Sequence, residues 1–230
     1  VDNRNCPIGA EVLLRWEHPK HGLILPNRFI PLAEDIGLIV PLGLWVLETA
    51  CAQLKIWQNE ASACGLTLAV NVSSKQFRQP DFVAKVQQAI LASDINPSHL
   101  KLEMTESIVL ENVEDTIAKM LELKLLGISF SMDDFGVGYS SLSYLKRLPL
   151  NQIKIDQSFV RDITSDPNDA AIVQTIIEMT KTLGLSVIAE GVETEAQRKF
   201  LDMRGCHFFQ GYLFSKPVPI ELFEKLLKKH

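Results

Sequence analysis

Acidic side chains recur at the ends of successive short apolar segments in this sequence. The set consists of Glu11, Asn71, Glu103, Asp133 and Glu190, with Asp134 and Asp156 close by. Carboxylate and amide oxygens are hard ligands that suit Mg²⁺ or Mn²⁺, and several carboxylates in one place repel one another without cations. If the chain brings these ends together, the sequence predicts a site for divalent cations.

Two further features suggest what such a site would do. Asp133 and Asp134 are adjacent and could serve two metal ions, as in many phosphoryl-transfer sites. Lys154 is the lone amine in the set. The alternative is that these acids are helix caps and solvated strand ends, which would not require them to share one side of their segments.

The elements that must position these residues alternate between strands and helices. Asn112 and Asp166 are expected helix caps, Thr194 with Gln197 forms an expected capping box, and a last helix follows Pro219. Spacings of about 25–35 residues between strands predict a parallel sheet with crossover helices. The expected strands are Ala10–Trp16, Leu66–Ser73, Leu100–Thr105, Ile128–Asp133, Gln152–Asp156, Ser186–Glu190 and Cys206–Gln210.

Side-chain alternation favours a barrel over a doubly wound open sheet. In the segment from Ile128 to Asp133, the bulky residues share one face, and Ser129, Ser131 and Asp133 share the other. An open parallel sheet covered by helices has two apolar faces, whereas a (β/α)₈ barrel turns one face inward. We therefore expect a TIM-like barrel in one domain over residues 1–230. Because seven of eight strands are visible, we expect the first strand to be missing and the chain to be cut from a longer protein.

Composition narrows the function classes. Hydrophobic residues make up 47% and charged residues 22% of the chain, as in a globular domain, and the net charge is −5. An acidic chain without a Lys/Arg run argues against DNA binding and membrane-surface binding. The longest apolar stretch, Gly37 to Leu47, is interrupted by Pro41, so no membrane-spanning helix is expected. The four cysteines form no CxxC motif, so we expect free thiols in a reducing compartment. No signal peptide is visible, and we expect a cytoplasmic domain.

Seven motifs, in this order, resemble the EAL domain family of cyclic di-GMP phosphodiesterases over nearly the whole chain. They are Glu11-Val-Leu-Leu-Arg-Trp16, Asn71-Val-Ser-Ser, Leu102-Glu-Met-Thr-Glu106, Asp133-Asp-Phe-Gly-Val-Gly-Tyr-Ser-Ser141, Ile153-Lys-Ile-Asp156, Ala189-Glu-Gly-Val-Glu193 and Gln210-Gly-Tyr212.

The resemblance implies hydrolysis of cyclic di-GMP to linear pGpG with two Mg²⁺ or Mn²⁺ ions. It implies that Lys154 holds or helps to deprotonate the attacking water. Arg15 would contact a substrate phosphate, and Gln210 would lie near the substrate. Glu106 would anchor the glycine loop after Asp133, with Glu193 in an outer position. The implied metal ligands are Glu11, Asn71, Glu103, Asp133, Asp134, Asp156 and Glu190, of which Glu11 and Glu190 also act in catalysis.

The chain departs from the family pattern at two motif positions. Val12 stands where the family has Ala, and its outward parity predicts altered packing against helices with Glu11 in place. Val137 stands where Thr is frequent, so loop dynamics could differ. The family also implies upstream sensory or GGDEF-type domains and a homodimer face near the segment Leu142–Leu148.

Two other functions remain open at this level. The chain could be a receptor module that binds cyclic di-GMP without cleaving it, or a scaffold that binds a protein partner. Because each implied ligand position carries a competent residue, catalysis is the favoured expectation.

Overall fold

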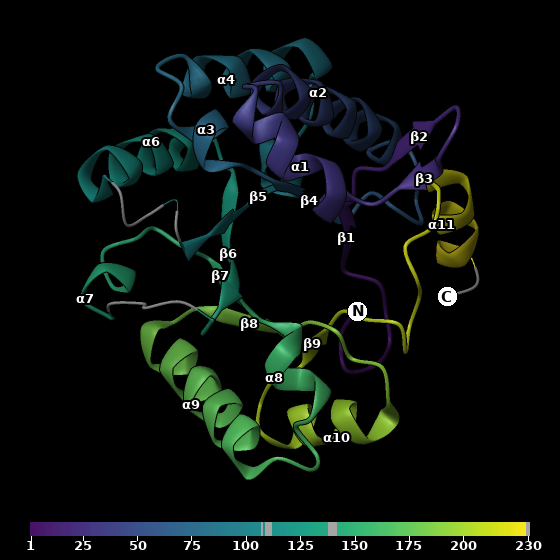
Figure 1. The fold of residues 1–230 in the computed structure, drawn as a ribbon, viewed down its shortest axis with the longest axis vertical. Coiled ribbons are helices and arrows are strands. Elements are labelled where there is room, and N and C mark those ends of the chain that lie inside the picture. The colour runs from purple at the N-terminus through teal and green to yellow at the C-terminus, as the bar shows by residue number, and fades with distance from the viewer. Residues whose placement is uncertain (107, 109–111, 138–141, 229–230) are drawn as a thin grey trace.

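A ring of parallel strands surrounds the centre of the molecule, with helices outside it (Figure 1). The structure, a computed structural model, describes residues 1–106, 108, 112–137 and 142–228. Within these residues the main sheet has seven strands in the order β1-β4-β5-β6-β7-β8-β9, and each pair of neighbours is parallel. This sequential order, without the reversal of a doubly wound sheet, confirms the barrel prediction.

The first two residues of the chain pair with the last strand of the sheet, β9 (Phe208–Phe209). Val1 and Phe209 exchange two hydrogen bonds of 2.8 and 2.9 Å, and Asp2 forms an antiparallel bridge with Phe208. The first residues of the chain therefore run antiparallel to β9.

The strand positions agree with the expected ones, with differences at their ends. They are β1 (Gly9–Val12), β4 (Thr67–Asn71), β5 (Leu100–Thr105), β6 (Ser129–Phe135), β7 (Gln152–Ile155), β8 (Ser186–Ala189) and β9 (Phe208–Phe209). The first expected strand, Ala10–Trp16, is wrong in its second half. The sheet pairing ends at Val12, and Trp16 begins a separate antiparallel hairpin of β2 (Trp16–His18) and β3 (Gly22–Ile24).

Three helices begin at the caps that the sequence predicts. Asn112 accepts a hydrogen bond from the Asp115 amide at the start of α6, and the capping box of Thr194 and Gln197 opens α10. Asp166 caps α9. The helices are α1 (Pro26–Asp35), α2 (Ile39–Trp57), α3 (Ser74–Phe77), α4 (Phe82–Ser93), α6 (Val113–Leu125), α7 (Leu142–Leu145), α8 (Gln157–Arg161), α9 (Pro167–Leu183), α10 (Glu195–Met203) and α11 (Ile220–Leu227), with a 3₁₀ turn at Pro97–His99.

Helix α2 corrects the expectation about membrane-spanning segments. Pro41 does not interrupt it, because proline in the first turn of a helix removes no hydrogen bond that the helix would otherwise make. By length and composition α2 is the one helix among the described residues that could cross a membrane, which is weak evidence. Its buried residues, including Leu47, Leu54 and Trp57, belong to the hydrophobic core that the helices form with the sheet.

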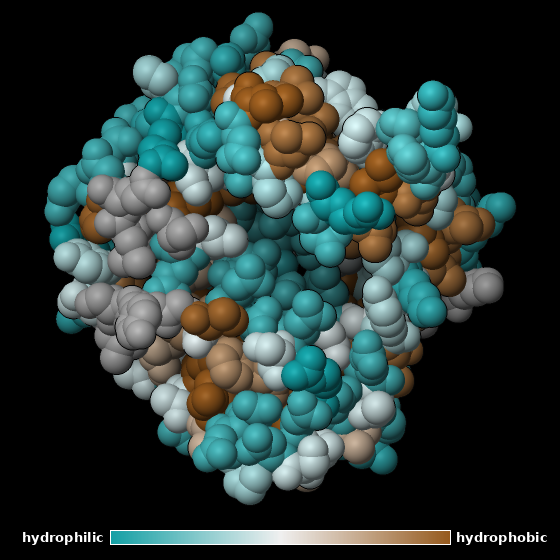
Figure 2. All heavy atoms as spheres, in the orientation of Figure 1, coloured by the Kyte–Doolittle hydropathy of each residue, from teal (hydrophilic) through white to brown (hydrophobic). Residues whose placement is uncertain are grey.

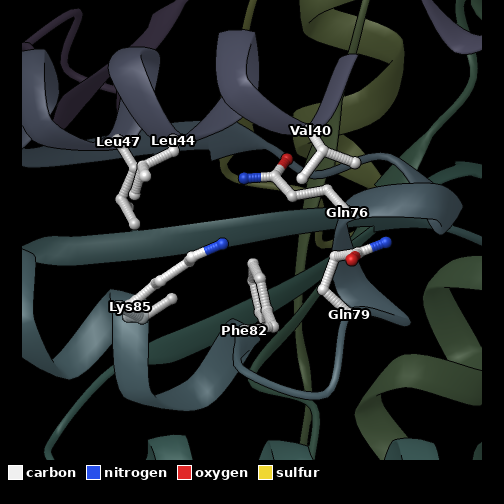
Figure 3. A pocket seen from close by; sticks show the side chains of 8 residues that line it. Val40, Leu44, Leu47, Gln76, Gln79, Phe82 and Lys85 are labelled. Carbon is white, nitrogen blue, oxygen red and sulfur yellow. The ribbon is translucent and has the colours of Figure 1, made fainter. Parts of the chain in front are cut away.

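A small hollow lies in the helical layer between α2, α3 and α4 (Figure 3). Gln76 extends from α3 over α2 there, and an ideal Cβ on Gly43 would lie 2.2 Å from its Oε1 atom. Glycine at this position therefore allows the side chain to cross the helix. The hollow is lined by residues of the helical layer and by none of the acidic residues described above.

Candidate active site

The acidic residues meet inside the ring because all the main-sheet strands run in one direction. Glu11 on β1, Asn71 on β4 and Glu103 on β5 are successive register partners or their neighbours across the sheet. Asp133 lies on β6, while Asp156 and Glu190 directly follow β7 and β8. Figure 2 shows hydrophilic side chains around a hollow at the centre of this face, inside the ring of strands in Figure 1.

Lys154 lies at the centre of this cluster. Its side chain is 1% exposed, and its Nζ atom contacts carboxylate oxygens from four strands or strand ends. The oxygens are Glu190 Oε1 at 2.6 Å, Glu103 Oε2 at 2.7 Å, Asp133 Oδ1 at 3.0 Å and Glu11 Oε2 at 3.4 Å. One buried ammonium therefore holds the inner faces of four acids.

The cluster carries more negative charge than Lys154 neutralises. Burial raises the pKa of Glu103 to about 7 and that of Glu190 to about 8, against the opposing attraction of Lys154. Burial would lower the pKa of Lys154, but the surrounding acids hold it well above its usual value. The pKa of Glu11 is lowered because Lys154, Gln210 and Asn71 together outweigh its burial. A further cation would therefore stabilise the ionised cluster.

Asp133 and Asp134 both reach the site although they are adjacent in sequence. In a regular strand they would point to opposite faces. Here the β6–β7 pairing shifts register between Met132 and Phe135, and Asp134 has a φ of 52°. Ligand oxygens of Asp133, Asp134 and Glu190 lie within 4.8 Å of one another. Such an oxygen set fits a divalent cation.

Three more expected site residues lie at the edge of the cluster. Asn71 Nδ2 donates to Glu11 Oε1 at 2.6 Å, and Gln210 Nε2 donates to Glu11 Oε2 at 2.7 Å. The pKa of Asp134 is raised to about 6 by burial and by the negative charges of Asp133 and Asp156, and Asp156 also hydrogen-bonds Asp134. Each of the seven implied ligands therefore contacts another member of the cluster or lies beside one.

The expected outer residues are not brought into these contacts. Arg15 donates to the Leu14 carbonyl at 2.9 Å, and Glu193 is exposed. Both carboxylate oxygens of Glu106 are buried without a hydrogen-bond partner among the described residues. The glycine loop is described as far as Val137, which is 64% exposed, and residues 138–141 lie outside the description. Val12 packs against the core, as its parity predicted.

Sequence reasoning was wrong in treating Lys154 as the only inward amine. Lys101 also points inward from β5, and its Nζ donates to Gln152 Oε1 on β7 at 2.9 Å. Its alternation with Leu100 and Leu102 indicates this orientation, because those residues are fully buried on the opposite face.

The comparison with known families agrees with the fold. The profile of the EAL domain matches residues 2–217. The chain is 48% identical over 214 residues to the bifunctional diguanylate cyclase/cyclic di-GMP phosphodiesterase MucR of Pseudomonas aeruginosa. That alignment covers 93% of this chain but 31% of the relative, so the chain spans about a third of that protein's length.

Solved structures give the same result. A MucR phosphodiesterase in complex with c-di-GMP has a TM-score of 0.93 and 47% identity, over 97% of this chain and 90% of that one. The Klebsiella pneumoniae BlrP1 complex with manganese and c-di-GMP has a TM-score of 0.76 and 30% identity, over 91% of this chain and 51% of that one. From its sequence, its barrel and its acidic site, the chain belongs to the EAL domain family.

Proposed function

We propose that this chain hydrolyses one phosphodiester bond of cyclic di-GMP and releases linear pGpG, with two Mg²⁺ or Mn²⁺ ions. The observation that carries the proposal is the cluster of five acids around the buried Lys154 at the strand ends. The complexes of MucR and BlrP1 with c-di-GMP support the choice of substrate, and the manganese in the second supports the choice of metal.

The acidic residues would bind two metal ions, and each residue's position decides which ion it binds. Glu11, Asn71, Glu103 and Asp133 would hold one ion, and Asp133, Asp134, Glu190 and Asp156 would surround the second. When bound, the ions lower the pKa of water and neutralise phosphate charge.

Lys154 would act by charge and orientation. Its high pKa keeps it protonated, so it donates hydrogen bonds and stabilises negative charge, and it is a poor general base. Glu11 and Glu190 flank its ammonium and fix its direction. Arg15 and Gln210 would contact the substrate, and Glu106 and Glu193 would support the loops around it.

One incubation tests the proposal against its alternative. The purified chain is mixed with cyclic di-GMP and Mn²⁺ or Mg²⁺, with EDTA as the control, and the products are separated by chromatography. We expect pGpG only with the metal. Tight binding without product would instead show a receptor module, and neither binding nor product would favour a scaffold.

The surroundings of the domain are also proposals. We propose that residues 1–230 act as one catalytic domain of a multidomain signalling protein, a suggestion supported by the two activities in MucR's name. A homodimer through the segment around α7, a cytoplasmic location and the absence of DNA and membrane contacts stay predictions. Analytical ultracentrifugation of the purified chain tests the dimer.

A further inference from the structure

A second, partly buried amine lies beneath the carboxylate cluster and has no part in the mechanism above. Lys101 is two residues before Glu103 on β5, and both side chains face the inside of the ring. Two residues of strand span about 6.6 Å, so the Lys101 side chain starts one layer below Glu103. It lies farther from the carboxyl ends of the strands, where a substrate would enter, than Glu103 does.

Two links join β5 to β7 across β6. In the lower layer Lys101 Nζ on β5 donates to Gln152 Oε1 on β7 at 2.9 Å. In the upper layer Lys154 Nζ on β7 donates to Glu103 Oε2 on β5 at 2.7 Å. Ser131 of β6 is the register partner of both Glu103 and Gln152 and is fully buried. A small side chain on β6 therefore lies where the two links pass over that strand.

Lys101 has no carboxylate of its own to neutralise its charge among the ion pairs of the described residues. Its hydrogen-bond partner is the neutral amide of Gln152, so its charge acts on the cluster above it. The charge interacts attractively with Glu103 and repulsively with Lys154. Inside the barrel, where the effective dielectric constant is low, such an interaction extends over a layer of side chains.

We propose that Lys101 sets the affinity of the carboxylate cluster for divalent cations by placing a fixed positive charge beneath it. The inference rests on the proposed metal site. Lys101 touches neither substrate nor reacting atoms, so it is a positioning residue that acts through the field at Glu103. Its charge opposes the entry of each divalent ion, and a neutral residue at this position makes the site bind metal more tightly.

The test measures Mn²⁺ binding directly by isothermal titration calorimetry at constant pH and ionic strength, without substrate. Lys101→Met removes the charge, and Lys101→Arg keeps it. Lys101→Met combined with Gln152→Leu removes the charge without leaving the buried amide unpaired, and circular dichroism checks that each variant folds. We expect both neutral variants to bind Mn²⁺ about tenfold more tightly, and the arginine variant to bind within twofold of the unchanged protein.

The contrary results are distinct. If the neutral variants bind Mn²⁺ no more tightly than the unchanged protein, the inference is wrong, even where that protein still cleaves cyclic di-GMP. If the arginine variant changes affinity as much as the methionine variants do, packing and not charge is responsible, and the inference is again wrong. If the unchanged protein binds no Mn²⁺, the proposed metal site fails and the inference fails with it.

Discussion

Replacing Lys154 by methionine should cost the metal-free protein much of its stability. The change removes the ammonium that contacts four acids at 2.6–3.4 Å and leaves a side chain of similar length. At an effective dielectric constant of about 20, one contact near 2.7 Å corresponds to about 6 kcal/mol of attraction, most of which offsets the desolvation of the charges. Breaking a buried ion pair from one side costs about 3–5 kcal/mol, and we expect a loss in that range.

Urea unfolding at pH 8.5 with EDTA measures this loss. At pH 6 the loss should be smaller, because the acids nearest to Lys154 can take up protons in the variant. Saturation with Mn²⁺ at about 100 times its dissociation constant should restore about 2.7 kcal/mol. Lys55→Met, which breaks an exposed ion pair with Asp94, is the control and should leave stability unchanged. A Lys154→Met protein as stable as the unchanged one at pH 8.5 would refute the electrostatic account.

Three further predictions follow from the same structure. Gly211→Ala should lower the free energy of unfolding, measured in urea, by about 2 kcal/mol or more, since the new Cβ would lie 2.2 Å from the Val192 carbonyl oxygen. Gly43→Ala is the control, because its Cβ would meet the end of a side chain that can move. Stability of the metal-free protein should fall as pH rises from 4.5 to 8, because the raised pKa values of Glu103 and Glu190 make the folded state bind more protons than the unfolded state there. Added Mn²⁺ should stabilise the protein most at the upper end of this range. Thermal melts with EDTA or Mn²⁺ measure both effects, and a difference in melting temperature between the two that does not change with pH would contradict this. Two cysteines should react quickly with a thiol reagent, and two should react only after the protein unfolds. Burial raises the pKa of the two slow thiols to about 11 and about 12, so a fast reaction of all four would contradict this. The fast pair is Cys6 and Cys64, and the slow pair is Cys51 and Cys206.

Side-chain alternation carried most of the fold prediction. The strand from Leu100 to Thr105 is found with the bounds expected, because apolar and polar residues alternate along its whole length. The strand from Ala10 to Trp16 was overextended, because its apolar residues continue past Val12 into a segment that leaves the sheet for a hairpin. Alternation describes burial, and it cannot tell where hydrogen bonding to a neighbouring strand ends.

The acid cluster could also be anticipated, but its geometry could not. Parallel strands bring their carboxyl ends together, so Glu11, Glu103 and Asp133 were expected to be neighbours. The register shift that turns Asp134 to the same side depends on the pairing of β6 with β7, which single-sequence patterns do not contain. Lys101 shares the inward parity of Glu103, but it lies one layer below the strand ends, so its position did not mark it as a site residue.

The most direct test of the central claim compares metal-dependent product formation in the unchanged protein and in Asp133→Asn. Asp133 contacts Lys154 and also belongs to the close oxygen set with Asp134 and Glu190. With cyclic di-GMP and saturating Mn²⁺, we predict pGpG from the unchanged protein and a rate lower by about a thousandfold or more in the variant, with folding retained. A variant that keeps near-full turnover, or an unchanged protein whose turnover survives EDTA, would contradict the assignment of this cluster as the catalytic site.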